Sequence, residues 1–224
     1  MDRGLIGKIH NCDCLDFMKQ LPDKCVDLCL TDPPYGILGG TKTIGGTNIV
    51  EATIYPEMTW DYNPISPETL KEVFRISKNQ IIFGYNHFSD LLPSTKCFIA
   101  WDKACQNGWN DTFADGELAW TSFDKPAKFY RYLWKGALKA QKERRYHPTQ
   151  KPLTVLKWIL QDFSNESDII FDPFMGSGTT AVASYQMGRK WFGCEISSAY
   201  VEIANKRIAE EMNNLFENGD CENG

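Results

Sequence analysis

The sequence predicts an α/β fold built on a mostly parallel sheet with an antiparallel edge. Apolar stretches of strand length alternate with stretches of helical periodicity along most of the 224 residues. Turns containing proline or glycine follow the apolar stretches that end at Leu30 and Phe171. Further strand candidates lie close together in the middle of the chain with few helices between them, which is typical of antiparallel pairing.

The composition is that of a globular protein, with 42% hydrophobic and 24% charged residues, and it excludes a wholly disordered chain. No stretch reaches membrane-spanning length, and no signal peptide opens the sequence. We therefore expect a cytoplasmic protein whose eight cysteines are free thiols. Their spacing does not match the paired knuckles of a structural zinc site, so no metal is expected.

The first part of the chain reads as a strand, a helix and a second strand. The pattern predicts a short strand at residues 5–10, a helix at 15–21 and a buried strand at 26–30. Asp13 and Asp32 each stand just past a strand. Because ligands bind at the carboxyl ends of strands in open α/β sheets, we expect both carboxylates at that edge.

The second strand runs into Asp32-Pro33-Pro34-Tyr35, a turn that both prolines make stiff. The turn holds together a carboxylate, an outward-facing carbonyl on Pro33 and an aromatic ring. A planar exocyclic amine would match this set, with Asp32 and the Pro33 carbonyl accepting its two hydrogens and Tyr35 stacking on its ring. A surface turn in which Asp32 caps a neighbouring segment is the alternative, and four residues alone do not decide between the two.

Residues 37–63 are predicted to form a mobile loop, because glycine doublets at 39–40 and 45–46 are costly to order. Beside a ligand-binding strand end such a loop can close as a lid, and a plain flexible connection is the alternative. A helix is expected from about Pro67, with Ser66 as its N-cap and an apolar face at positions 70, 73, 74 and 77. Strand candidates follow at 80–83, 97–101 and 117–123.

A basic segment follows these strands. Residues 124–151 carry a net charge of +7, whereas the rest of the chain sums to −12. Segment 124–146 is predicted to be a short insert that contacts a polyanion, because aromatic residues are interleaved with the basic ones. A solvated charged helix face is the alternative. The interleaved aromatic residues are Phe129, Tyr130, Tyr132, Trp134 and Tyr146, and the nucleic-acid-binding candidates are Lys125, Lys128, Arg131, Lys135, Lys139, Lys142, Arg144 and Arg145.

A helix is expected at 153–160, and residues 168–185 then read as a strand, a glycine turn and a helix. The glycines allow close approach of a ligand, and the helix N-terminus offers free N–H groups. A phosphate-binding loop would need a lysine after Gly178, where Thr179 stands, so a phosphate-free cofactor fits better.

The next strand candidate, residues 191–194, ends on Glu195. Glu195 stands about twenty residues beyond the glycine turn, where an acid can accept from ribose hydroxyls in Rossmann-like folds. Capping of the helix expected at 197–213 is the alternative role. The polar tail 217–224 is expected to fray.

These motifs, in this order, resemble those of the S-adenosylmethionine-dependent DNA amino-methyltransferases. The resemblance rests on Asp32-Pro33-Pro34-Tyr35, on residues 172–179 (Asp-Pro-Phe-Met-Gly-Ser-Gly-Thr) and on residues 147–152, and it covers about residues 5–206. The catalytic motif precedes the cofactor motif, which is similar to the permuted beta group of adenine-N6 and cytosine-N4 enzymes. The resemblance implies one methyltransferase domain over residues 1–224, with a circularly permuted, Rossmann-like class I methyltransferase fold.

The resemblance also implies the roles of site residues. Asp32, Pro33, Pro34 and Tyr35 would form the catalytic turn that holds a flipped base. The methionine end of S-adenosylmethionine would be surrounded by Phe171, Asp172, Phe174, Gly176, Gly178 and Thr179, and closed by Thr149 and Lys151. Glu195 would accept from the ribose hydroxyls of the cofactor, and Asp13 would bind its adenine.

An aspartate rather than a serine before the two prolines favours N6 of adenine in double-stranded DNA as the target, in site-specific methylation of the restriction-modification kind. Cytosine N4, an RNA or protein-amide substrate, and a catalytically silent DNA-binding subunit stay open as alternatives. The 23 residues 124–146 leave little room for a recognition domain, so relaxed specificity, a second subunit or a homodimer also stays open. The implied setting is a bacterial, archaeal or phage-infected cell.

Overall fold

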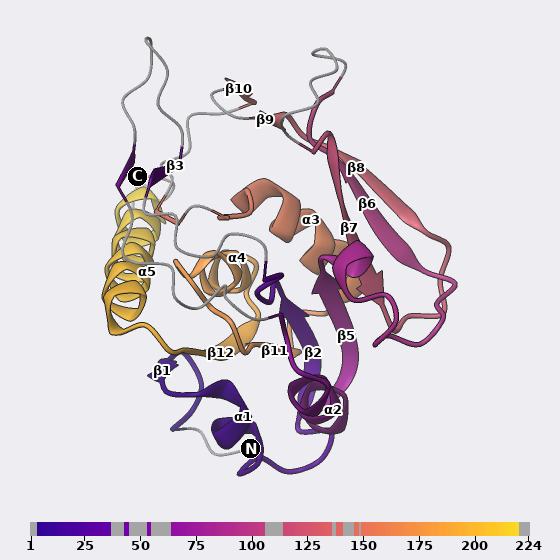
Figure 1. The fold of residues 1–224 in the computed structure, drawn as a ribbon. Helices are drawn as coiled ribbons and strands as arrows, with labels where there is room; N and C mark the ends of the chain where they lie inside the picture. Colours follow the sequence, from indigo (N-terminus) through magenta and orange to yellow (C-terminus); the bar gives the residue numbers. More distant parts are fainter. Residues whose placement is uncertain are drawn as a thin grey trace.

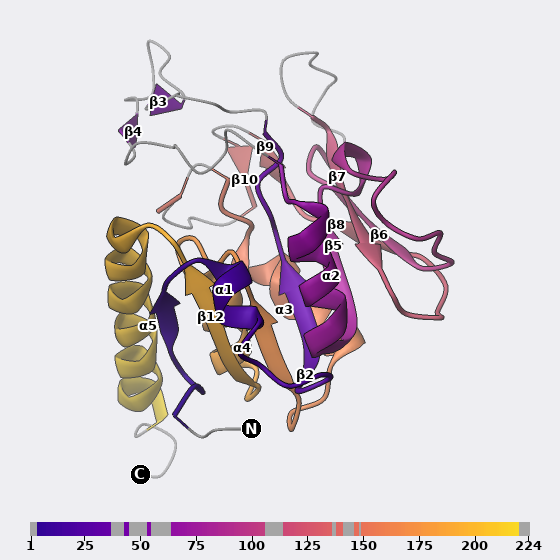
Figure 2. The ribbon, with the colours of Figure 1, turned by 60° about the horizontal axis from the view of Figure 1, so that its bottom comes forward.

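The computed structural model describes residues 4–36, 43–44, 53–54, 64–105, 114–135, 138–140, 146–147 and 149–219. These residues form a sheet of eight strands in the order β1-β12-β11-β2-β5-β7-β6-β8, with helices on both faces (Figures 1 and 2). The strands of this sheet are β1 Ile9–Asn11, β2 Val26–Thr31, β5 Ser77–Phe83, β6 Phe98–Asp102, β7 Gly116–Thr121, β8 Lys128–Arg131, β11 Ile169–Asp172 and β12 Lys190–Glu195.

Within the described part of the chain, five helices cover the sheet, and a short 3-10 helix follows β5. Helices α1 and α2 pack on one face, whereas α3, α4 and α5 lie on the other side (Figure 2). The bounds are α1 Cys14–Met18, α2 Pro67–Ile76, η2 Tyr85–His87, α3 Leu153–Phe163, α4 Thr179–Gln186 and α5 Ser198–Gly219. Two small pairs, β3 Thr43–Ile44 with β4 Thr53–Ile54 and β9 Trp134–Lys135 with β10 Leu138–Lys139, lie outside the main sheet.

The sheet has a parallel part and an antiparallel edge, as the sequence predicts. Strands β1, β12, β11, β2 and β5 run parallel to one another. Strand β7 pairs antiparallel with both β5 and β6, and β8 then pairs parallel with β6. The fold prediction is confirmed, and the carboxyl ends of β2, β11 and β12 meet at one edge of the sheet.

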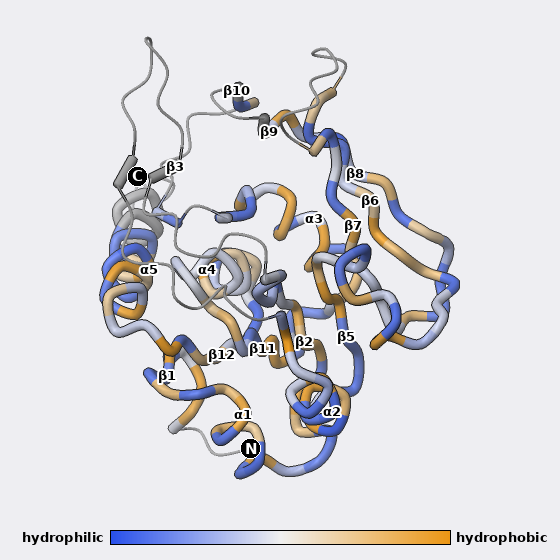
Figure 3. The backbone as a smooth tube through the Cα atoms, in the orientation of Figure 1, coloured by the Kyte–Doolittle hydropathy of each residue, from blue (hydrophilic) through white to orange (hydrophobic). Residues whose placement is uncertain are grey.

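The core has two layers, one on each side of the sheet. Leu28 and Leu30 of β2 pack with α3 and α4, whereas Cys29 between them packs with α1 and α2. This division follows from the two-residue period of side chains along a strand. The hydropathy colouring of Figure 3 shows apolar stretches along β2 and β11 in the middle of the molecule.

Several predicted boundaries are wrong near turns. The strand expected at 5–10 is confined to β1, because residues 4–7 form a turn in which Gly7 has a φ of +75°. The Gly7 amide nitrogen donates to the Trp191 carbonyl over 2.6 Å, which fixes this turn on β12. Helix α1 ends at Met18 rather than at residue 21, and β5 begins at Ser77, which was expected on the face of the preceding helix.

The C-terminal helix is longer than predicted. Helix α5 continues past residue 213 to Gly219, so three residues of the tail expected to fray are helical. Of the predicted mobile loop 37–63, only β3 and β4 lie within the described residues, and the remainder lies outside them. Among the described helices, none is long and apolar enough to span a bilayer.

The predicted basic insert 124–146 contains a strand of the main sheet, β8. Tyr130, Tyr132 and Trp134 are buried in the core of the antiparallel edge, so they are not available to stack on bases. The ring of Phe129, in contrast, is 73% exposed. The stacking prediction is therefore wrong for the three buried rings. Residues 141–145, which include Lys142, Arg144 and Arg145, lie outside the described part of the chain.

Candidate active site

A cavity of about 220 Å³ opens at the carboxyl ends of β2, β11 and β12. Both predicted motifs line it, together with the segment that precedes α3. Ten of the predicted site residues contribute to the wall: Asp13, Asp32, Pro34, Thr149, Lys151, Asp172, Phe174, Gly176, Thr179 and Glu195. The structure thus brings the catalytic and cofactor motifs together although 140 residues separate Asp32 from Asp172.

Two predicted cofactor residues have structural positions instead. The ring of Phe171 is fully buried in the core beneath the cavity. Gly178 begins α4 with a φ of +81°, and a Cβ added there would come within 3.0 Å of the Ala204 Cβ of α5. The glycine is therefore required for its backbone conformation and for close packing of α4 against α5.

Asp172 fastens the two motifs to each other. Its carboxylate accepts hydrogen bonds from the hydroxyl of Thr31 over 2.8 Å, from the hydroxyl of Thr180 over 2.7 Å and from the amide of Phe174 over 3.0 Å. Burial raises the pKa of this carboxyl to about 6, and the three hydrogen-bond donors oppose this increase. Asp172 lines the cavity, and its contacts also connect β2, β11 and α4.

Glu195 has the capping role that the sequence offers as an alternative, and it also lines the cavity. Its Oε1 accepts from the amide of Ser197 over 2.8 Å, so the residue does cap the turn before α5. Its Oε2 accepts from the amide of Gly176 in the glycine turn, also over 2.8 Å. Burial raises the pKa of Glu195, and these backbone donors oppose the increase. The carboxylate is thereby fixed in the cavity wall with further lone pairs able to accept.

Asp13 is the N-cap of α1. Its Oδ1 accepts from the amide of Leu15 over 2.8 Å and from that of Asp16 over 3.3 Å. The side chain also borders the cavity. No sequence motif singles out Cys12, Cys14 and Ile196, which also line the cavity, and Ile196 is 61% exposed. An apolar side chain this exposed, beside two carboxylates, is suited to a ligand with both a flat apolar ring and polar substituents.

The catalytic turn is held by a buried cation. Lys151 Nζ lies 2.5 Å from Asp32 Oδ2, and only 7% of the lysine side chain is exposed. The Tyr35 hydroxyl donates to the other oxygen, Asp32 Oδ1. Burial raises the pKa of Asp32, whereas the ammonium of Lys151 lowers it. The resemblance implies that Lys151 closes the methionine pocket of the cofactor; in the structure Lys151 lines the cavity and pairs with the Asp32 carboxylate.

Two charged residues outside the predicted motifs extend this pair. Lys151 Nζ also lies 3.0 Å from Glu117 Oε2 on β7, and Lys103 Nζ lies 2.7 Å from Glu117 Oε1. Although burial alone would raise the pKa of Glu117, the two lysines lower it to about 2. No local motif points to Glu117 or Lys103, because their position depends on how β6 and β7 pair.

Tyr35 rests on the segment that follows β5. Its ring stacks on the His87 imidazole with the centroids 4.6 Å apart and the planes 16° from parallel. Gly84 supports the same ring, since a Cβ added at this residue would lie 2.2 Å from Tyr35 Cε1. Gly84 and His87 are therefore site residues that sequence reasoning missed.

His147 packs behind the glycine turn. The ring is 8% exposed, lies 4.4 Å from the Tyr200 ring and would be 3.7 Å from a Cβ at Gly176. Its Nδ1 lies 3.0 Å from the Thr149 hydroxyl. Burial, and then the nearby charge of Lys151, lower the pKa of His147 to about 3, so the imidazole is neutral at pH 7. His147 shapes the cavity without charge.

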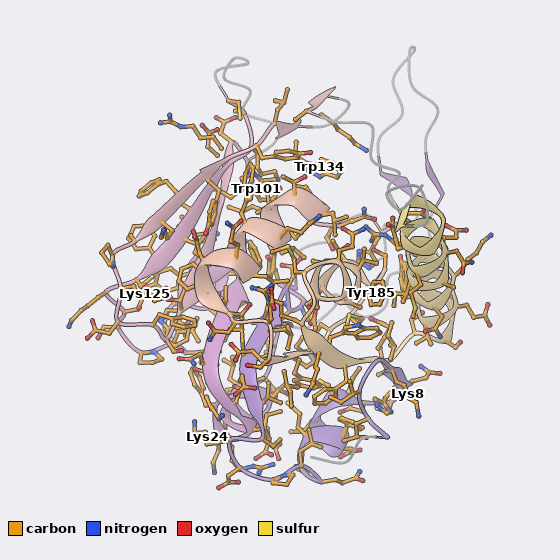
Figure 4. The ribbon with its side chains drawn as sticks, turned by 180° about the vertical axis from the view of Figure 1, so that it is seen from behind. Lys8, Lys24, Trp101, Lys125, Trp134 and Tyr185 are labelled. Atoms are coloured by element: carbon orange, nitrogen blue, oxygen red, sulfur yellow. The ribbon has the colours of Figure 1, made fainter. Side chains whose placement is uncertain are left out.

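The described basic candidates lie at two ends of β8. Lys125 precedes the strand, where its Nζ donates to the Asp162 carbonyl, and Lys128 pairs with the Asp162 carboxylate over 3.2 Å. Figure 4 shows Lys125 at the far end of the antiparallel edge from Trp134. Arg131, at the other end of β8, is 83% exposed. Lys139 lies with its Nζ 4.5 Å from the centroid of the Trp134 ring, and Lys135 belongs to the adjoining β9.

The family model and the curated proteins that match this chain agree with one another. A family model described as DNA methylase matches residues 52–206, more than half of the chain. Among curated proteins, the type II methyltransferase M.HpaI of Haemophilus parainfluenzae is 28% identical, with 95% of this chain and 76% of that protein covered. M2.DpnII of Streptococcus pneumoniae is 27% identical, with 91% of this chain and 89% of that protein covered.

Solved structures agree with these sequence matches. The complex of M1.HpyAVI with SAM superposes with a TM-score of 0.60 and 26% identity, covering 90% of this chain and 98% of that one. The cytosine-N4-specific PvuII DNA methyltransferase superposes with a TM-score of 0.59 over 95% of both chains. At 14% identity, the PvuII likeness concerns the fold alone.

Proposed function

Because this chain belongs to the family of S-adenosylmethionine-dependent DNA methylases that modify exocyclic amino groups, we propose that it methylates N6 of adenine in double-stranded DNA. The observation that carries the proposal is the Asp32 carboxylate, held by Lys151 in a proline-stiffened turn at the cavity. Its negative charge suits an amine that donates hydrogen bonds rather than a carbonyl that accepts them.

The cavity fits the cofactor of this family. We propose that Glu195 accepts from the ribose hydroxyls and Asp13 from the adenine amine, with Ile196 against the adenine ring. Phe174, Gly176 and Thr179 would surround the methionine end, and Thr149 would close it. The cofactor supplies an electrophilic methyl group on a sulfonium sulfur.

The proposed mechanism uses the catalytic turn to prepare the amine. The nitrogen lone pair of adenine is delocalised into the ring, so the amine is a weak nucleophile. Hydrogen bonds from its two hydrogens to Asp32 and to the Pro33 carbonyl would draw the nitrogen towards tetrahedral geometry and aim the lone pair at the methyl group. Once the amine has taken the methyl group, the proton that it must lose would leave to Asp32 or to water. Orientation of this kind can lower a barrier by several kcal/mol.

The base must leave the duplex to reach Asp32. We propose that the protein flips the adenine, which costs about a few kcal/mol of unstacking, and stacks it near Tyr35. Exposed Arg131 at the cavity end of β8, with Lys135 and Lys139 beyond it, would contact phosphates. Lys125 and Lys128 are also proposed phosphate contacts, though their partner Asp162 competes for them.

The decisive experiment is incubation with labelled S-adenosylmethionine and unmethylated duplex DNA, followed by digestion to nucleosides and mass spectrometry. We expect N6-methyladenine. N4-methylcytosine would instead support the second candidate, because the acceptor pair on Asp32 and Pro33 would serve any aromatic amine. Label in RNA or protein alone, or in no polymer, would contradict the proposal.

Replacement of Asp32 provides the matched control. Asp32→Ala removes the acceptor for the amine while leaving the Glu195 end of the cavity intact, so we expect methyl transfer to be lost. Binding of S-adenosylmethionine, measured by calorimetry, should remain. Transfer that survives in Asp32→Ala would show that the assigned chemistry is wrong.

A further inference from the structure

Four side chains of alternating charge lead from the antiparallel edge of the sheet to the catalytic turn. In order they are Lys103, Glu117, Lys151 and Asp32, and consecutive charged atoms lie 2.7, 3.0 and 2.5 Å apart. Only Lys151 and Asp32 belong to the predicted motifs. Glu117 and Lys103 are remote in the sequence and have no role in the mechanism given above.

The antiparallel pairing explains how Glu117 reaches this place. Strand β7 runs opposite to β5, so its beginning lies at the edge where β2 and β5 end. Glu117 is the second residue of β7 and pairs in register with Trp101 of β6. Lys103 directly follows β6, and its amide donates to the Asp115 carbonyl over 2.8 Å, which holds the two strand ends together. A parallel strand here would place its first residues at the opposite edge.

Because these charged side chains are largely buried, each depends on its neighbours to compensate its charge. Lys151 is 7% exposed, and Glu117 and Lys103 are 22% and 19% exposed. A buried cation is costly unless opposite charges and hydrogen bonds compensate it. With Asp32 alone, Lys151 would have one counter-charge and could turn its ammonium away. Glu117 adds a second acceptor on the other side, so the two carboxylates together fix the position of Nζ.

We propose that Glu117 is a positioning residue for methyl transfer, which acts through Lys151 to fix the orientation of the Asp32 carboxylate. A carboxylate offers about four lone-pair positions. Lys151 occupies one lone-pair position on Asp32 Oδ2, and the Tyr35 hydroxyl occupies one on Oδ1. One position on each oxygen is therefore left to accept a hydrogen from the amine of the base. Lys103 holds Glu117 through its other oxygen, Oε1. This inference rests on the proposed function.

The test is Glu117→Gln, which keeps the size of the side chain and removes its charge. We expect the single-turnover rate of methyl transfer to fall about 100-fold, because small errors in placing a reacting group have effects of this size. Dissociation constants for S-adenosylmethionine and for duplex DNA should stay unchanged, since Glu117 contacts neither in this scheme. Glu68→Gln is the matched control, because it breaks a 3.0 Å ion pair with Lys19 in which the side chains are 62% and 49% exposed.

A double variant separates positioning from a structural effect. If Glu117 acts through Lys151, then adding Glu117→Gln to Lys151→Met should slow transfer little beyond Lys151→Met alone. If the double variant instead loses rate by the product of the two single fold-changes, the proposal is overturned. Should Glu117→Gln fail to fold, Lys103→Gln tests the same arrangement by removing the lysine that pairs with Glu117 Oε1, with a smaller loss of rate expected.

The outcomes distinguish this inference from the proposed function. Transfer at the wild-type rate in both Glu117→Gln and Lys103→Gln would overturn the inference and leave the proposed function standing. Absence of transfer by the wild-type protein would overturn the proposed function and this inference with it. Equal losses of rate and of DNA binding in Glu117→Gln would show a binding role and also overturn the inference.

Discussion

At the scale of single residues, three carboxylates meet at the cavity from neighbouring strands of the parallel sheet, and a local motif made each of them predictable. Asp32, Asp172 and Glu195 all line the cavity, because each directly follows or ends a strand of the parallel sheet. Glu117 and His87 could not be found in this way. Their relation to Asp32 and Tyr35 comes from strand pairing and from a short 3-10 helix, which no local pattern encodes.

Gly84 gives a sharp test of how Tyr35 is held. Its φ is +79°, and an added Cβ would meet the Tyr35 ring at 2.2 Å. We expect Gly84→Ala to lower the free energy of unfolding by more than about 1 kcal/mol and to slow methyl transfer, because Tyr35 must move. Denaturant unfolding and the transfer assay measure the two effects.

Gly188→Ala is the control for Gly84→Ala. Gly188 has a similar φ of +72°, and nothing lies within 4 Å of an added Cβ. The free energy of unfolding of Gly188→Ala should therefore fall only by the cost of the strained backbone, and its methyl transfer should be normal. Equal stability losses in the two variants, together with normal transfer in both, would show that Tyr35 does not depend on Gly84.

At the scale of secondary structure, elements were predicted best where capping residues and apolar periodicity agree. Helix α2 begins at the expected place, since Ser66 Oγ accepts from the Thr69 amide over 3.1 Å and Pro67 takes the first helical position. The aromatic residues of β8 show the opposite case. The two-residue period of the strand places Tyr130 in the core and Phe129 at the surface. The basic residues around them instead favoured the prediction of a surface that binds nucleic acid.

Removing the cap of α2 should cost a defined amount of stability. We expect Ser66→Ala to lower the free energy of unfolding by about 1 kcal/mol, because the Thr69 amide loses its acceptor. Ser66→Asp retains an acceptor and favours the positive helix end, so it should remain close to the wild type. Urea unfolding at pH 7 measures both. A larger loss in Ser66→Asp than in Ser66→Ala would contradict this account.

At the scale of the whole molecule, stability depends on pH through Asp172. Burial raises its pKa to about 6 in the folded protein, above the ordinary 3.8. A carboxyl whose pKa is raised by folding stabilises the protein below pH 4, and this contribution is lost as the pH rises through 6. The shift corresponds to roughly 3 kcal/mol.

Asp172→Asn isolates this contribution. Asparagine keeps the shape and one acceptor but does not ionise, so the decrease in unfolding free energy between pH 4 and pH 7 should be smaller in the variant than in the wild type. Denaturant unfolding at both pH values measures the difference. The buried groups Asp32, Glu195 and His147 titrate in both proteins and cancel in the comparison. Parallel pH dependence in the two proteins would contradict the raised pKa.

The pairing of β1 with β12 has a consequence for how the chain is made. His10 and Cys194 are partners in register, so β1 has no partner in the sheet until β12 has left the ribosome. The glycine turn and Glu195, which build much of the cavity, are also synthesised after β1 and β2. Contacts between residues so distant along the chain form slowly. The nascent polypeptide therefore carries an unpaired β1 and a half-built cavity until β12 has been synthesised.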